Sequence, residues 1–191
     1  MIRIDAKSLK NGFHWKDYVS SMTENKKNLN KLIQIVKLKK DLHNSIKTLE
    51  PKLENKNIII LTEDFCPDSL FNLPIFITMS ELISNLSLQI FKRSENEYLN
   101  ETCQNLGLTK IPALLITDKY LNILSQWEEK PKKAYKIQSD LMQKNKLLYE
   151  TKSNSDLTLK ELMINSLEYE YNNSLWKETI SEINKIANKI N

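Results

Sequence analysis

Residues 58–74 read IIILTEDFCPDSLFNLP and carry the strongest structural signal in the 191-residue chain. Residues 58–61 form a short, uninterrupted and mostly β-branched run, which is typical of a central strand that is covered on both faces. The proline after Cys66 suits the first turn of a helix, because its missing N–H is not needed there. Asp68 and Ser69 are also favourable in a first helical turn. The stretch therefore predicts a buried strand, a short turn, and a helix with Cys66 at its N-cap.

The segments around this stretch predict an alternation of helices and strands. The first fifty residues place apolar side chains at helical spacing, and Pro51 is expected to end that helical segment. The elements expected on the other side are an apolar helix within 70–86, a strand over 88–91, a helix over 95–106, strands over 113–117 and 121–127, and helices from residue 132 onward.

The composition describes a globular protein that can bury a core, since 40% of the residues are hydrophobic and 27% are charged. No apolar run approaches the roughly 18 residues of a spanning helix, and the first residues lack the apolar stretch of a secretory signal. We therefore expect a cytoplasmic protein without membrane contact. The net charge of +4 rests on lysines mixed with 24 acidic residues, because only Arg3 and Arg93 are arginines. Nucleic-acid recognition favours arginine and interleaved aromatic residues, so no nucleic-acid partner is expected.

The two cysteines and two histidines limit the chemistry that the chain can perform. Cys66, Cys103, His14 and His43 are too scattered to supply four tetrahedral zinc ligands, and one possible bridge is no disulfide framework. We therefore expect neither a metal nor a prosthetic group. Any thiol chemistry must depend on a single cysteine.

In the order of its elements, the chain resembles the thioredoxin superfamily. The pair Phe65-Cys66 follows a buried strand, and Ser69 stands where the second cysteine of a CxxC motif would be. Pro74 falls eight residues after Cys66, which is the spacing of the thioredoxin kink proline. Ile111-Pro112 precedes a strand, as the cis-proline of that superfamily does.

A narrower resemblance, to a bacterial and archaeal thioredoxin-like family, covers about residues 13–137 and more weakly the rest. Members of that family carry a T-E-D-W-C-G-D signature, N-terminal helices and a helical tail. Phe65 and Pro67 depart from its commonest Trp and Gly, and Ala113 replaces the threonine that follows the cis-proline in thioredoxins. The matching stretches here are Thr62-Glu63-Asp64-Phe65-Cys66-Pro67-Asp68, Asn72-Leu73-Pro74, Trp127 and Lys130-Pro131.

The resemblance implies an α/β fold, a thioredoxin-like three-layer sandwich with a central mixed sheet, N-terminal helices and a C-terminal helical extension. We divide the chain into an N-terminal helical segment over 1–52 that packs on the core, a thioredoxin-like core over 53–138, and the C-terminal helical extension over 139–191. Within the extension, residues 152–156 are the most loop-like. An apolar stripe is expected to cover the domain rather than bind a partner, and consists of Trp176, Ile180, Ile183, Ala187 and Ile190.

The resemblance also implies thiol–disulfide exchange, with Cys66 as the nucleophile and Ser69 beside it in the catalytic site. Cysteine attacks disulfides as the thiolate, which a helix N-terminus favours. Three nearby carboxylates oppose the thiolate, so we expect the pKa of Cys66 to be lowered only in part. The substrate-binding residues that the resemblance implies are Phe65, Pro67, Ile111 and Pro112.

Ser69 cannot resolve a mixed disulfide, so an external thiol would have to release it. For Cys103, a buried core thiol is favoured over a resolving role. Dithiol thioredoxins keep a buried aspartate where this chain has Ile60, so proton transfer would need Glu63, Asp64 or water. The expected partner is a protein disulfide or a low-molecular-weight thiol, and the chain is a monomer or a homodimer. The alternative function is a redox-inactive, thioredoxin-fold module for protein interaction.

Overall fold

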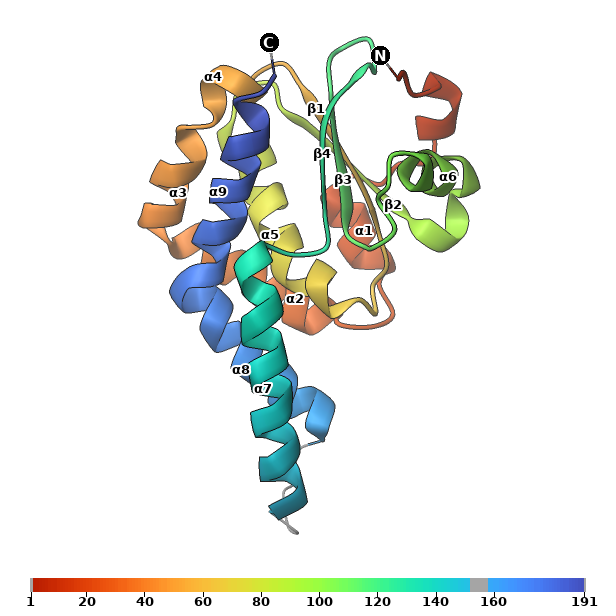
Figure 1. Cartoon of the computed structure of the whole chain (residues 1–191). Coiled ribbons are helices and arrows are strands. Elements are labelled where there is room, and N and C mark those ends of the chain that lie inside the picture. Colours follow the sequence, from red (N-terminus) through yellow and green to blue (C-terminus); the bar gives the residue numbers. More distant parts are fainter. Residues whose placement is uncertain (1, 152–157, 191) are drawn as a thin grey trace.

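The computed structural model describes residues 2–151 and 158–190, which form a mixed sheet between two layers of helices (Figure 1). The strands are β1 (Asn57–Thr62), β2 (Ser87–Lys92), β3 (Ala113–Thr117) and β4 (Ile123–Glu128). Their order in the sheet is β2-β1-β3-β4. β1 pairs parallel with β2 and antiparallel with β3, and β3 pairs antiparallel with β4. The predicted three-layer α/β sandwich with a central mixed sheet is confirmed.

Helices occupy most of the remaining described residues. Those before the sheet and within it are η1 (Ala6–Leu9), α1 (Trp15–Ser21), α2 (Lys26–Leu38), α3 (Lys40–Lys47), α4 (Glu50–Leu53), α5 (Pro67–Leu82), η2 (Arg93–Glu95) and α6 (Glu97–Asn105). Those that follow the sheet are α7 (Lys132–Thr151), α8 (Leu159–Glu170), the π-helical segment η3 (Tyr171–Leu175) and α9 (Trp176–Ala187).

Both faces of β1 are covered, which explains its uninterrupted apolar run. Ile58 and Ile60 belong to the larger hydrophobic cluster, together with residues of α2, α3, α5 and α9. Ile59 and Leu61 belong to a smaller cluster with Phe91 and residues of η1 and α6. Figure 1 shows α6 on one side of the sheet and α3, α5 and α9 on the other. Successive side chains of a strand point to opposite faces, so a strand buried on both sides needs apolar residues at every position.

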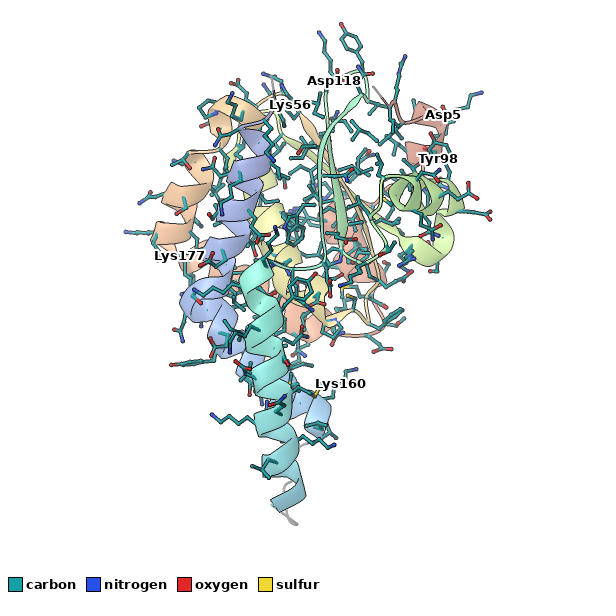
Figure 2. All side chains as sticks on the ribbon, in the orientation of Figure 1. Asp5, Lys56, Tyr98, Asp118, Lys160 and Lys177 are labelled. Atoms are coloured by element: carbon teal, nitrogen blue, oxygen red, sulfur yellow. The ribbon has the colours of Figure 1, made fainter. Side chains whose placement is uncertain are left out.

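Apart from η1, which packs on the α6 side of the sheet, the helices near the two ends of the chain pack on the same side as α5. Trp176 is buried, and its indole N–H donates to the Phe71 carbonyl oxygen at 2.8 Å. The Tyr171 ring stacks on the Phe71 ring, with 4.7 Å between the ring centroids. Lys177, on the outer side of α9, pairs with Asp41 of α3 at 2.8 Å (Figure 2). The apolar stripe of α9 therefore covers the domain, as the sequence predicted.

Two local features differ from the sequence-based prediction or lie beyond it. Pro51 does not end a helix; it lies in the first turn of the short helix α4, where its missing N–H is tolerated. Residues 152–156, predicted as a loop, lie outside the described residues.

α5 continues through Pro74 to Leu82, and the Thr78 hydroxyl donates to the Pro74 carbonyl oxygen at 2.8 Å.

Candidate functional site

Cys66 lies where the sequence places it, at the N-cap of α5 just after β1. Its thiol donates a hydrogen bond to the carbonyl oxygen of Ile111, with 3.5 Å between sulfur and oxygen. The Ile111–Pro112 peptide bond is cis, as predicted. Two segments 45 residues apart in sequence thus meet at the cysteine sulfur.

The cis-proline loop is held in place from the end of β4. The backbone N–H groups of Thr109 and Lys110 both donate to Oε2 of Glu128, at 2.9 and 3.0 Å. The N–H of Glu129 donates to the Pro112 carbonyl oxygen at 2.8 Å. These bonds satisfy polar groups of the loop and leave the Ile111 carbonyl directed at Cys66.

Ser69 lies one helical turn beyond Cys66 and is buried beneath it. Its hydroxyl oxygen accepts a hydrogen bond from the Thr62 hydroxyl at 2.5 Å. The hydroxyl proton of Ser69 is then available to the Cys66 sulfur, and this hydrogen bonding lowers the thiol pKa. Ser69 is therefore positioned to stabilise a thiolate, although it cannot form a disulfide.

The pKa of the Cys66 thiol is raised, whereas the sequence predicted that it would be lowered in part. Burial raises the pKa of the Cys66 thiol above its ordinary value, and the negative charge of Asp68 raises it further. Hydrogen bonds from the side chain and backbone of Ser69 lower the pKa but do not cancel the effect of burial. The prediction was wrong because helix-start geometry can be read from sequence, whereas desolvation of the sulfur cannot.

The neighbouring acidic pair, Glu63 and Asp64, is engaged in holding other segments. Oε1 of Glu63 accepts from the backbone N–H of Ser94 at 2.6 Å. Oδ2 of Asp64 accepts from the backbone N–H and the hydroxyl of Thr23, at 2.8 and 3.0 Å. Although partial burial alone raises the pKa of Asp64, hydrogen bonds from Thr23 and Glu24 hold it below its ordinary value. These contacts identify both carboxylates as anchors for the chain, and give no support to a proton-transfer role.

The acidic residue that matters most at the site is Asp68, two residues after Cys66. Its Oδ2 lies 3.2 Å from Nζ of Lys130, and both side chains are largely removed from solvent. Burial raises the pKa of Asp68 above its ordinary value, and the charge of Lys130 offsets this only in part. A carboxylate in this position can exchange a proton with its surroundings closer to neutral pH than an exposed aspartate.

The Asp68–Lys130 pair belongs to a larger charged cluster that joins α5, β4 and the cis-proline loop. Nζ of Lys130 also pairs with Oε1 of Glu129 at 2.9 Å, and Glu129 pairs in turn with Lys110, which directly precedes Ile111. The Tyr135 hydroxyl donates to the same carboxylate. Although burial alone raises the pKa of Glu129, hydrogen bonds from Lys110, Tyr135 and Lys130 hold it below its ordinary value. The cluster therefore links the Asp68 carboxylate, in the first turn of α5, to the cis-proline loop.

Asn72 connects this site to the C-terminal helices. Its side-chain N–H group donates to the Asp68 carbonyl oxygen at 2.8 Å and to the Tyr171 hydroxyl at 3.1 Å. Its side-chain oxygen accepts from the Thr179 hydroxyl at 2.8 Å. The helical extension thus fixes the first turn of α5 from below. Lys130, Tyr171 and Thr179 were not predicted as site residues, because no spacing rule relates positions 62 to 107 residues from their partners. Only Lys130 lies in a stretch that matches the narrower family.

The predicted substrate-facing residues differ in exposure. Phe65 is 54% exposed and Pro67 is also exposed, so apolar surface flanks the cysteine. Ile111 is half-buried and Pro112 is buried. Together they place a largely enclosed sulfur beneath an apolar rim, an arrangement that can receive an extended apolar segment more readily than a charged one.

Cys103 lies on the other side of the sheet from Cys66. It is 2% exposed and packs in the cluster with Leu99 and Phe91. Burial raises the pKa of its thiol to about 11. The predicted interpretation as a buried core thiol is confirmed, and its place across the sheet separates it from any disulfide formed at Cys66.

Of the two histidines, His14 has a structural role, whereas the buried Nε2 of His43 has no hydrogen-bond partner among the described residues. His14 caps α1, where its Nδ1 accepts from the backbone N–H of Lys16 at 3.4 Å. Trp127 is buried, and Trp176 is buried as predicted for a residue of the covering stripe. Among the described residues, no three His, Cys, Asp or Glu side chains are arranged to hold a metal ion. Across the same part of the chain, no helix has both the length and the apolar character needed to cross a bilayer.

Comparison with known proteins agrees with the fold described above. The fold is similar to the crystal structure of an HIV epitope scaffold, with a TM-score of 0.65, 16% identity and coverage of 96% of each chain. It is also similar to a protein of unknown function from Pseudomonas aeruginosa, with a TM-score of 0.60, 18% identity and coverage of 89% of this chain and 99% of that one. No curated protein matches. The family model Thioredoxin_9, described as thioredoxin, matches residues 12–144, and the chain therefore belongs to this thioredoxin family.

Proposed function

We propose that this protein is a thiol–disulfide exchange protein that acts through the single nucleophile Cys66. The observation that carries the proposal is the contact between the Cys66 thiol and the Ile111 carbonyl oxygen at the start of α5. This contact places the sulfur beside a backbone acceptor that an extended substrate can also use. The narrower resemblance to the T-E-D-W-C-G-D family supports the same assignment of Cys66.

The exchange proceeds in two steps. The Cys66 thiolate attacks one sulfur of the substrate disulfide, the substrate S–S bond breaks, and the other sulfur leaves as a thiolate that takes up a proton. An external low-molecular-weight thiol then attacks the mixed disulfide as its thiolate. Cys66 is released, and the external sulfur stays bound to the substrate sulfur. An external thiol is needed because Ser69 has no sulfur and Cys103 lies across the sheet.

Asp68 is the group that exchanges the proton in this proposal. Its buried carboxylate accepts the proton of the Cys66 thiol and returns it to the departing thiolate, so that the charge in the site stays constant. Lys130 stabilises the carboxylate form, and the two further charges of Glu129 and Lys110 balance each other nearby. The buried aspartate that dithiol thioredoxins place at the position of Ile60 is replaced here by one at the helix start.

The Ile111 carbonyl binds the substrate in the same step. In the resting protein it accepts the Cys66 S–H, and this hydrogen bond is lost when the thiol loses its proton. The carbonyl oxygen is then available to a backbone N–H of the substrate, which pairs like an added strand. Deprotonation of the cysteine and docking of the main chain are thereby coupled.

A redox-inactive interaction module is the second candidate, because burial raises the pKa of Cys66 and disfavours the thiolate. The test measures exchange with hydroxyethyl disulfide and with a peptide disulfide, with glutathione as the external thiol, for wild type, Cys66→Ser and Cys103→Ser. Exchange by wild type that survives in Cys103→Ser and is lost in Cys66→Ser supports the exchange protein. Absence of exchange in the folded wild type at every pH from 6 to 10 rules it out and leaves the interaction module.

A further inference from the structure

An apolar pocket of about 310 Å³ opens beside the cysteine motif, between α7 and α8. Its walls include Met142, Met163 and Ile164, and Pro67 forms the edge toward the site. The polar side chains that line it are Gln138 and Lys160. The volume lies at the lower end of the roughly 300–1,000 Å³ found for ligand pockets, which suits one or two side chains rather than a large cofactor.

We propose that this pocket binds an apolar side chain of a peptide substrate, next to the cysteine whose disulfide is attacked. The inference rests on the proposed function and selects a protein disulfide over a small charged disulfide as the substrate. Its first support is position, since Pro67 is the residue after Cys66 and consecutive Cα atoms lie about 3.8 Å apart. The pocket edge at Pro67 therefore lies within one residue of the cysteine that a substrate segment would bind.

The chemistry of the walls defines the occupant. Methionine side chains are flexible and polarisable, so Met142 and Met163 can adapt to aliphatic or aromatic groups of different shape. A charged group would lose hydration there with few polar atoms to replace it. Lys160 is exposed and lies 3.5 Å from Glu24, so its charge is directed away from the apolar walls. Figure 2 shows Lys160 at the start of α8, beside α7.

The pocket is built into the helical pair by buried hydrogen bonds between α7 and α8. Asn145 of α7 is buried and donates to the Ser166 hydroxyl at 2.9 Å. The same side chain contacts Sδ of Met163 at 3.3 Å. These contacts fix the spacing of the two helices and the position of a wall residue. A preformed pocket loses less side-chain freedom on binding than one that must open first.

A substrate would therefore be held at three places. Its sulfur binds Cys66, its main chain pairs with the Ile111 carbonyl, and its neighbouring apolar side chain enters the pocket. Oxidised glutathione supplies the first of these contacts but has no apolar side chain for the third. The C-terminal helical extension thus acts in substrate selection in addition to covering the core.

Direct binding is tested without chemistry by using Cys66→Ser protein with ¹³C-labelled methionine methyl groups. The chain has five methionines, of which Met142 and Met163 line the pocket while Met79 is buried in the core. Adding a peptide of sequence Gly-Leu-Ser-Leu-Gly at millimolar concentration should shift the Met142 and Met163 signals and leave Met79 unchanged. The peptide Gly-Ser-Ser-Ser-Gly should shift neither. Equal effects of both peptides, or no shift with the leucine peptide, would overturn the proposal that the pocket binds an apolar side chain.

Selectivity is tested by exchange kinetics with peptide disulfides of thionitrobenzoate that carry Leu or Ser beside the cysteine. Wild type should react about tenfold faster with the Leu peptide, since burying a large apolar side chain contributes at least this much. Met142→Glu should bring the ratio close to one. Its matched control, Leu38→Glu, changes an apolar residue that is 82% exposed at the end of α2 and should keep the tenfold ratio. Met142 is itself 47% exposed, so its substitution should leave the fold intact.

The two proposals fail in different ways. If neither peptide nor hydroxyethyl disulfide reacts, the proposed function is wrong, and the methyl signals alone then decide whether the pocket binds a peptide. If hydroxyethyl disulfide reacts normally while the Leu and Ser peptides react at equal rates, exchange stands and the pocket proposal is overturned.

Discussion

The two cysteines of this chain differ in their surroundings far more than in their exposure. Cys66 is 8% exposed and Cys103 is 2% exposed, and burial raises the pKa of both thiols. Around Cys66, however, lie a carbonyl oxygen, a serine hydroxyl and a carboxylate with its lysine. Around Cys103 lie apolar side chains such as Leu99 and Phe91. Burial alone therefore does not distinguish a candidate nucleophile from a core residue; the polar groups near the sulfur do.

The difference has a physical cause in the fold. The sulfur of Cys66 is at a helix start, where backbone N–H groups lack helical partners and polar loops converge. Cys103 lies within α6, whose backbone groups are already paired and whose inner face packs on the sheet. Neighbouring polar groups can thus change the pKa of the Cys66 thiol, whereas Cys103 is expected to be unreactive.

The largest expected difference is in alkylation of the folded protein. At pH 8 a thiol with a pKa of about 11 is only about one part in a thousand thiolate, so Cys103 should react very slowly. We expect Cys66 to be carboxymethylated at least about 100-fold faster, with both cysteines reacting at similar rates in guanidinium. Intact-mass analysis of wild type, Cys66→Ser and Cys103→Ser over time measures both rates. Equal rates in the folded protein would remove the distinction between the two sites.

The pH dependence of the same reaction tests the direction of the Cys66 shift. Because the pKa of Cys66 is raised, its thiolate should continue to form above the ordinary value for cysteine, and its alkylation rate should still be rising at pH 9. A rate that reaches a plateau by pH 7 would show that the helix start outweighs burial.

Asp68→Asn should change two rates at Cys66 by up to about tenfold, making alkylation faster and exchange with alkyl disulfides slower. Removing the negative charge lowers the pKa of Cys66, so its alkylation at pH 7 should be faster and the pH profile should move to lower pH. In the proposed mechanism Asp68 accepts and returns the proton, so the same substitution should slow exchange with alkyl disulfides, whose leaving thiolates need a proton. Exchange with thionitrobenzoate disulfides should not slow. Asp140→Asn removes an exposed surface carboxylate and is the matched control; a similar effect there would assign the change to net charge.

Ser69→Ala should have a smaller effect on Cys66, of about threefold to tenfold. The substitution removes the hydroxyl that lowers the thiol pKa, so alkylation at pH 8 should be slower. It also leaves the buried Thr62 hydroxyl without its acceptor, which should cost about 1 kcal/mol of the free energy of unfolding. Ser80→Ala, which removes a hydroxyl bonded to a carbonyl oxygen of the same helix, serves as control. An unchanged alkylation rate in Ser69→Ala would show that the Ser69 hydroxyl does not affect the Cys66 thiol.

The smallest effect on activity is expected for Cys103→Ala. This change removes one buried sulfur and should lower the free energy of unfolding by about 1–2 kcal/mol, measured by urea denaturation. Exchange at Cys66 should stay within about twofold of wild type. A large loss of exchange would assign Cys103 a role in the site that its position across the sheet does not explain.

Much of the architecture could be predicted from local patterns. The apolar run of β1, the proline after Cys66 and the helical spacing of apolar residues near both ends act over a few residues each. They predicted the strand, the helix start and the covering stripe of α9, all of which are confirmed. Pro51 shows the limit of such rules, because a proline suits both the end of one helix and the first turn of the next.

The site was predictable only in part. The place of Cys66 at a helix start followed from neighbouring residues, the cis-proline loop opposite it followed from the resemblance to thioredoxins, and both are present. For proton transfer the sequence left Glu63, Asp64 or water open. In the structure the two carboxylates accept hydrogen bonds from Ser94 and Thr23, and the buried pair is formed by Asp68 with Lys130. That pair joins residues 62 positions apart, so no local pattern could have revealed it.

The amino-acid sequence was sufficient to locate the candidate nucleophile, because a strand, a turn and a helix N-cap are set by neighbouring residues. It was not sufficient to predict how acidic that nucleophile is, which charge lies beside it or which pocket adjoins it. Those properties come from packing between distant segments, which removes water from the sulfur, pairs Asp68 with Lys130 and encloses the space between α7 and α8. Desolvation and ion pairing depend on the whole set of neighbours in three dimensions, and only the folded chain specifies that set.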